Sequence, residues 1–160
     1  MGGREDAGDG RPFFTLAEPS EGSYDPSGAS IVNMDDYPRY DIAGGVVFCP
    51  VFADNLSLNF VTFPPGSGFP THVHPEEQIS IVQDGEMEIT VGDLTRLVVP
   101  GDVIVFPSNV PHAGRTFDRA CRLVDIFSPP RTGMKDLIAR ADPVRSSAVD
   151  RWWKPEAGED

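Results

Sequence analysis

The sequence has 160 residues, of which 39% are hydrophobic and 24% are charged, and this length and composition predict one globular domain with its own core. Its formal net charge is −12 at pH 7, so the chain lacks the positive surface that binds nucleic acids or anionic membranes. We therefore expect a small-molecule partner, and neither a nucleic acid nor a membrane.

Residues 1–43 are predicted to form an N-terminal arm that is partly disordered. Glycine, aspartate, serine and proline are frequent in residues 1–12 and 18–30, a composition typical of loops. A short apolar run at residues 13–16 could add a strand.

Residues 44–131 follow a different pattern, in which short apolar runs alternate with turns. We expect strands at residues 46–52, 56–63, 78–82, 86–91, 94–99, 103–106 and 120–127. Asp84-Gly85, which separates two of these runs, is typical of a tight hairpin turn. Short strands at this spacing predict an all-β, single-domain antiparallel barrel or sandwich.

Residues 132–160 are predicted to form a C-terminal helix and tail. Apolar residues with helical spacing are Met134, Leu137, Ile138 and Ala141. We expect Pro143 to stop this short helix. Further along, Trp152 and Trp153 could dock on the barrel or on a second subunit, or could anchor the C-terminus.

Two features bear on the cellular compartment. The N-terminus has no apolar region typical of a signal peptide, and no apolar run reaches the roughly 18 residues of a membrane span. Cys49 and Cys121 lie within apolar strand-like runs, so we expect buried, reduced thiols. These features predict a cytoplasmic protein.

All three histidines of the chain lie in two short strand-like segments. His72 and His74 are two residues apart, so an extended strand turns both side chains to the same face. Gln78 has the same parity, and His112 lies in the second segment. Two imidazoles on one face can converge on a single metal ion.

Both segments resemble motifs of the cupin superfamily. Residues 66–85 resemble the first motif, with its conserved places filled by Gly66, His72, His74, Gln78 and Gly85. Residues 100–114 resemble the second motif, which opens with Pro100-Gly101-Asp102 and has His112 as its metal ligand. The resemblance covers about residues 46–131. It implies a jelly-roll barrel, a homodimer and one divalent transition metal ion bound by the three histidines and Gln78.

The chain departs from the family pattern at a few positions. Asn109 and Thr116 replace the glycine and asparagine of the second motif, and Gln78 stands where glutamate is usual. Three imidazole nitrogens and an amide oxygen suit Zn, Fe, Ni, Mn or Co. The neutral amide leaves the full dipositive charge on the site, which favours Lewis-acid chemistry over iron-based oxygen activation. Glu76 could offset that charge from nearby, or it could be a solvated loop acid.

Asp125 and Phe127 are two residues apart in the last predicted strand and therefore share a face. A buried aspartate needs a partner. Near a metal ion Asp125 could act as a general base. Alternatively it could make a structural hydrogen bond, or an ion pair with Arg122 or Arg131.

The segment of residues 125–131 resembles the closing segment of small cupins that linearise unsaturated uronates. This resemblance implies that Asp125 and Arg131 are catalytic and that Phe127 contacts the substrate. Phe60 and Ile81 are further candidates for apolar walls of the substrate site, although each could be plain core.

The combined pattern predicts a divalent-metal-dependent, non-redox enzyme. Other small cupins with a glutamine ligand act as isomerases or cyclases in natural-product pathways, that is, in secondary metabolism. We therefore expect an isomerase, lyase or cyclase that acts on a sugar acid or a natural-product intermediate. Two alternatives stay open: a metal-dependent dioxygenase on the same fold, and a non-catalytic cupin that binds a small molecule.

Overall fold

The computed structural model describes residues 28–144. Its contacts divide the chain into residues 1–31 and residues 32–160, and every strand and helix named below belongs to the second unit. The strand expected at residues 13–16 and the tryptophans at positions 152 and 153 lie outside the described residues. Within residues 28–144, no helix has the length and apolar character needed to cross a membrane.

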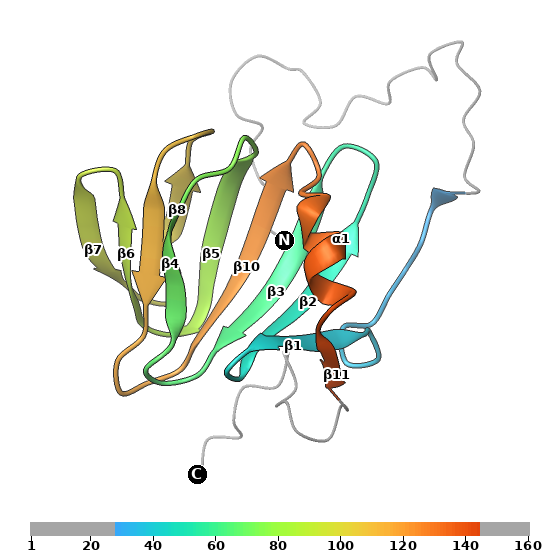
Figure 1. Cartoon of the computed structure of the whole chain (residues 1–160), viewed down its shortest axis with the longest axis horizontal. Helices are drawn as coiled ribbons and strands as arrows, with labels where there is room; N and C mark the ends of the chain where they lie inside the picture. The colour runs from blue at the N-terminus through green and yellow to red at the C-terminus, as the bar shows by residue number, and fades with distance from the viewer. Residues whose placement is uncertain (1–27, 145–160) are drawn as a thin grey trace, which may run out of the picture. The chain divides into compact units, whose positions relative to one another are not determined.

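The described chain forms two antiparallel sheets and one short helix, which confirms the predicted all-β class (Figure 1). The seven-stranded sheet contains, in spatial order, β11 (Asp142–Val144), β1 (Arg39–Ala43), β2 (Val46–Phe52), β3 (Ser57–Phe63), β10 (Cys121–Ser128), β5 (Glu77–Gly85) and β8 (Val103–Phe106). The four-stranded sheet contains β4 (Gly68–His72), β9 (His112–Arg115), β6 (Met87–Val91) and β7 (Leu94–Val98). Helix α1 (Gly133–Ile138) connects β10 to β11. Figure 1 shows the four-stranded sheet on one side of the barrel and β1, β11 and α1 on the other.

The seven-stranded sheet extends beyond the predicted range of residues 44–131 at both ends. Strand β1 lies in the predicted arm and is joined to β2 by Gly44 and Gly45, whose φ angles of 59° and 87° fit a two-residue hairpin turn. Strand β11 follows α1 and pairs with β1. Pro143, which was expected to stop the helix, lies in β11 at the edge of the sheet, where a missing N–H donor is tolerated.

The predicted hairpin at Asp84-Gly85 is wrong. Strand β5 pairs with β8 and β10, whereas β6 pairs with β7 and β9, so the chain passes from one sheet to the other at Gly85. Gly85 has a φ of +74°, and a Cβ there would overlap the carbonyl oxygen of Ala120. The glycine is required by this close approach. Instead, a two-residue turn that begins with Gly92 joins β6 to β7.

The main hydrophobic core lies between the two sheets. Its buried members include Val61, Phe63, Val82, Met87, Ile89, Phe106 and Leu123. A second, smaller cluster contains Met34, Cys49, Phe60 and Val124. Both cysteines are buried and free, and burial raises the pKa of the Cys121 thiol to about 12.

The register of β3, β10 and β5 sorts the residues on one face of the seven-stranded sheet into transverse rows. Two rows that carry polar side chains, here called the polar rows, are Ser57–Phe127–Gln78 and Asn59–Asp125–Ser80. Two apolar rows are Val61–Leu123–Val82 and Phe63–Cys121–Gly85. Because members of both kinds of row line the same cavity, one part of that cavity is polar and the other is apolar.

Candidate metal site

The three histidines converge at one point between the sheets. His72 ends β4 and His112 begins β9, and these two residues are direct partners in the β4–β9 register. His74 follows two residues later, in the connection to β5. One ligand nitrogen from each ring lies within 4.8 Å of the others. The fold therefore brings together all three predicted metal ligands of imidazole type.

Each imidazole is oriented by a backbone carbonyl two residues away. The Nδ1-to-oxygen distances are 2.9 Å from His72 to Pro70, 3.0 Å from His74 to Glu76 and 2.8 Å from His112 to Val110. Because a carbonyl oxygen only accepts, Nδ1 carries the proton in each neutral ring and Nε2 keeps its lone pair. The Nε2 atom of His112 is buried and has no hydrogen-bond partner among the described residues. A buried polar atom of this kind requires an explanation, and metal ligation provides one.

Gln78 is buried with its amide in a fixed orientation. Its Nε2 donates to Ser80 Oγ at 2.9 Å, so its Oε1 faces His74 Nε2 at 3.1 Å. Both facing atoms carry lone pairs when the His74 proton is on Nδ1. Protonation of the ring would relieve this conflict, but burial, together with the charge of Arg131, lowers the pKa of His74. A cation between the two atoms satisfies both, so the donor set fits a divalent metal ion.

Ser80 connects Gln78 to Asp125. The Ser80 hydroxyl is fully buried and donates to Asp125 Oδ1 at 2.5 Å. Burial raises the pKa of Asp125 to about 6, and the hydrogen bond from Ser80 is the largest opposing effect. Of the alternatives for Asp125, the structural hydrogen bond is therefore present, and its donor is Ser80. Sequence reasoning missed Ser80, although its polar side chain two residues after Gln78 was a usable signal.

A cavity of about 480 Å³ adjoins the histidines. Its polar lining includes His72, His112, Gln78, Asp125 and Arg131. Phe127 also lines it, with its ring centroid 5.4 Å from the Arg131 guanidinium carbon and 5.8 Å from the His74 ring centroid. The predicted catalytic residues and Phe127 are thus placed beside the candidate ligands.

Phe60 and Ile81 do not line this cavity, so their prediction as walls of the substrate site is corrected. Phe60 lies in the smaller hydrophobic cluster with Val124, and Val124 is also the cross-strand partner of Ile81. The reason is strand alternation: Asn59 faces the cavity, so the next residue points to the opposite face.

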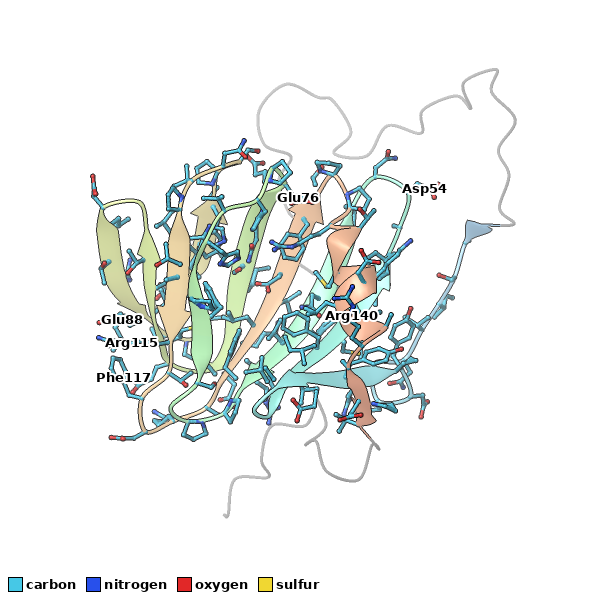
Figure 2. The ribbon with its side chains drawn as sticks, viewed as in Figure 1. Asp54, Glu76, Glu88, Arg115, Phe117 and Arg140 are labelled. Carbon is cyan, nitrogen blue, oxygen red and sulfur yellow. The ribbon has the colours of Figure 1, made fainter. Side chains whose placement is uncertain are left out.

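Glu76 lies beside the candidate ligands. Its side chain is 13% exposed, and Oε2 lies 3.3 Å from His74 Nδ1. This carboxylate oxygen is buried and has no hydrogen-bond partner among the described residues. Figure 2 shows Glu76 near the end of β5 at which the connection from β4 arrives. Glu76 is therefore not a solvated loop acid. Its carboxylate lies close enough to the candidate ligands to offset the charge of a bound cation.

Comparison with known proteins finds similarity over part of the chain. A family model described as the cupin domain (Cupin_2) matches residues 59–127. Dimethylsulfoniopropionate lyase DddQ from Ruegeria pomeroyi is 41% identical over 71 residues, which are 44% of this chain and 35% of that protein. H2HPP isomerase from Bacillus subtilis is 42% identical over 53 residues, which are 32% of this chain and 22% of that protein.

The solved structures agree with the family match. An RmlC-like cupin from Shewanella frigidimarina is 27% identical and superposes with a TM-score of 0.60 over 62% of this chain and 90% of that chain. The segments of this chain that match the two curated relatives span only about a third or less of each relative's own length.

Proposed function

Because this chain carries a domain of the cupin superfamily, we propose that it is a divalent-metal-dependent, non-redox enzyme that acts on a small oxygenated metabolite. The reaction is an isomerisation, elimination or cyclisation. The observation that carries this proposal is the convergence of one ligand nitrogen from each of three imidazoles, next to a cavity that the buried Asp125 carboxylate also lines. The two curated relatives named above are by name a lyase and an isomerase, and those names support the reaction class.

The atoms that would hold the metal are Nε2 of His72, His74 and His112 and Oε1 of Gln78. A divalent ion held by them would supply a positive charge to polarise a carbonyl or hydroxyl oxygen of the substrate. The fixed Nδ1 hydrogen bonds hold the three rings ready for ligation, so binding the ion requires little rearrangement. Because Gln78 is neutral, the ligand set itself leaves that positive charge undiminished.

Asp125 and Arg131 act on the substrate from the cavity wall. The Asp125 carboxylate lines the cavity, and Ser80 holds its Oδ1 atom, so its position relative to the histidines is fixed. We assign it the transfer of a proton to or from the substrate carbon or oxygen. The Arg131 guanidinium lies over the Phe127 ring and binds an anionic group.

Metal analysis of purified variants tests the ligand assignment. We expect Gln78→Ala to lower metal affinity and His74→Ala to remove the metal, as measured by elemental analysis after dialysis against a weak chelator. Gln83→Ala, an exposed glutamine on the same strand, is the matched control and should bind metal like the parent. Full metal occupancy in His74→Ala would contradict the assignment.

Turnover assays test the reaction class. Asp125→Asn should keep the metal and lower turnover by about 10²–10⁴, the usual contribution of a general acid or base. Unchanged turnover in this variant would return Asp125 to a structural role. A requirement for oxygen would identify a dioxygenase, and ligand binding without turnover would identify a binding module.

A further inference from the structure

Much of the cavity wall is apolar. The apolar lining residues include Val46 and Phe48 from β2, Phe63 from β3, Phe69 from β4, and Met134 and Leu137 from α1. The Phe69 ring lies 5.6 Å from the His72 ring and 5.7 Å from the ring of Phe63, a member of an apolar row, so the apolar lining begins beside the candidate ligands and continues along β3. A ligand that fills the cavity therefore meets the candidate metal ligands with one end and hydrocarbon with the other.

Several polar groups in the polar rows already have partners within the protein. The Gln78 amide donates to Ser80, and Ser80 donates to Asp125. The Asn59 Oδ1 atom accepts a hydrogen bond from the backbone N–H of Cys49 at 3.1 Å. A sugar acid has several hydroxyl groups that each need a partner when buried. Each unpaired hydroxyl lowers affinity roughly 5- to 150-fold, so this wall selects against polyhydroxylated ligands.

The Arg131 guanidinium is available to a ligand. It lines the cavity over the Phe127 ring, and no described carboxylate lies at ion-pair distance from it; burial lowers its pKa, and the charges of Glu76 and Asp125 oppose that effect. The backbone N–H of Arg131 donates to the buried Ser57 hydroxyl at 3.0 Å, which holds the main chain from which this side chain extends. A planar guanidinium matches a carboxylate with two parallel hydrogen bonds.

We propose that the substrate is a small carboxylic acid with a neighbouring carbonyl or hydroxyl oxygen and an apolar body. Its carboxylate binds Arg131, and its hydrocarbon body lies against the apolar wall that ends at Met134 and Leu137 of α1. Sugar acids are excluded from this class. This inference rests on the proposed function only for the contact between the metal and the carbonyl or hydroxyl oxygen. The contacts of the carboxylate and of the apolar body are made by side chains and need no metal.

Calorimetric binding of four acids to the zinc-loaded and the metal-free protein tests this substrate class. The probes are pyruvate, 4-methyl-2-oxopentanoate, phenylpyruvate and galacturonate. Because each buried methylene group strengthens binding about fourfold, 4-methyl-2-oxopentanoate should bind roughly 50-fold more tightly than pyruvate. Phenylpyruvate should also bind more tightly than pyruvate, and galacturonate no more tightly. Equal affinities for all four acids, or a preference for galacturonate, would overturn the proposal.

Two pairs of variants separate the body contact from the carboxylate contact. Leu137→Ser should weaken binding of 4-methyl-2-oxopentanoate about tenfold and leave pyruvate unchanged. Its control is Leu94→Ser, an exposed leucine on β7 outside the cavity lining. Arg131→Gln should weaken both oxo acids at least tenfold. Its control is Arg140→Gln, an exposed arginine just past the end of α1 (Figure 2). If Leu137→Ser weakens binding no more than its control does, the contact with the apolar body is wrong. If Arg131→Gln weakens binding no more than its control does, the contact with the carboxylate is wrong.

The two proposals fail in different ways. If the purified protein binds no metal, the proposed function is wrong, yet the metal-free protein should still prefer acids with an apolar body. If it binds metal and shows no such preference, the proposed function stands and the substrate class is wrong.

Discussion

Replacing Ser80 with alanine tests whether the Gln78 amide is oriented by its neighbour. The Ser80 hydroxyl is completely buried and contacts both Gln78 Nε2 and Asp125 Oδ1. An unpaired buried donor costs about 1–3 kcal/mol, and a lost hydrogen bond to a carboxylate costs about as much. We expect a loss of about 3 kcal/mol in unfolding free energy, which corresponds to roughly 6–12 °C in Tm for a chain of this size.

The same substitution should also weaken metal binding. With its acceptor partner gone, the Gln78 amide is free to rotate, and loss of a hydrogen-bonding partner behind a ligand typically lowers metal affinity about 10- to 100-fold. Competition with a chromophoric chelator measures the affinity, and differential scanning fluorimetry of the metal-free protein measures Tm. Ser57→Ala is the matched control, because Ser57 is equally buried. Its hydroxyl accepts a hydrogen bond from the backbone N–H of Arg131 and is not the partner of the Gln78 amide. If Ser80→Ala lowers Tm and its metal affinity stays within twofold of the Ser57→Ala value, the amide is oriented by something else.

Three further predictions concern stability and reactivity. Gly85→Ala should lower the unfolding free energy measured in urea by more than about 3 kcal/mol, because the new Cβ would overlap the backbone. Gly66→Ala is the control: Gly66 has a φ of +70° but open space around it, so this variant should lose only about 1–2 kcal/mol. The Cys121 thiol, with its pKa raised to about 12, should resist iodoacetamide at pH 8 until the protein is unfolded; mass spectrometry would show rapid labelling of the folded protein if this is wrong. Burial raises the pKa of Asp125 to about 6, so in the metal-free protein the folded state holds the Asp125 proton more tightly than the unfolded state. The unfolding free energy should therefore fall by up to about 3 kcal/mol as the pH rises from about 4 to 6. Asp125→Asn should remove this fall, and an identical pH profile in both proteins would contradict it.

The histidine cluster was predictable because its spacing is visible in the sequence. His72 and His74 share a parity, and the fold adds His112 by direct cross-strand pairing. The position of Asp125 and Phe127 on one face was equally readable from strand alternation. The strands at the two edges of the predicted domain were missed because both are short; β11 also depends on long-range pairing with β1, whereas β1 joins β2 through a local turn.

Other features could not be read from local patterns. Both faces of β3 carry apolar residues, so alternation alone did not show that Asn59 faces the cavity and Phe60 does not. An Asp-Gly pair between two alternating strands fits a hairpin as well as a crossing between sheets. The strand partners distinguish the two, because β5 pairs with β8 and β10 whereas β6 pairs with β7 and β9.

The carbonyl groups that hold the three imidazole rings have a consequence for how such a protein can diversify. Each carbonyl belongs to the same short stretch of backbone as the ring that it holds, so ring orientation is encoded locally. Substitutions on β2, on α1 or at Arg131 can therefore reshape what enters the barrel and leave the histidine geometry intact. On the proposed function, the groups that would set reactivity and those that would set selectivity therefore lie in separate parts of the chain.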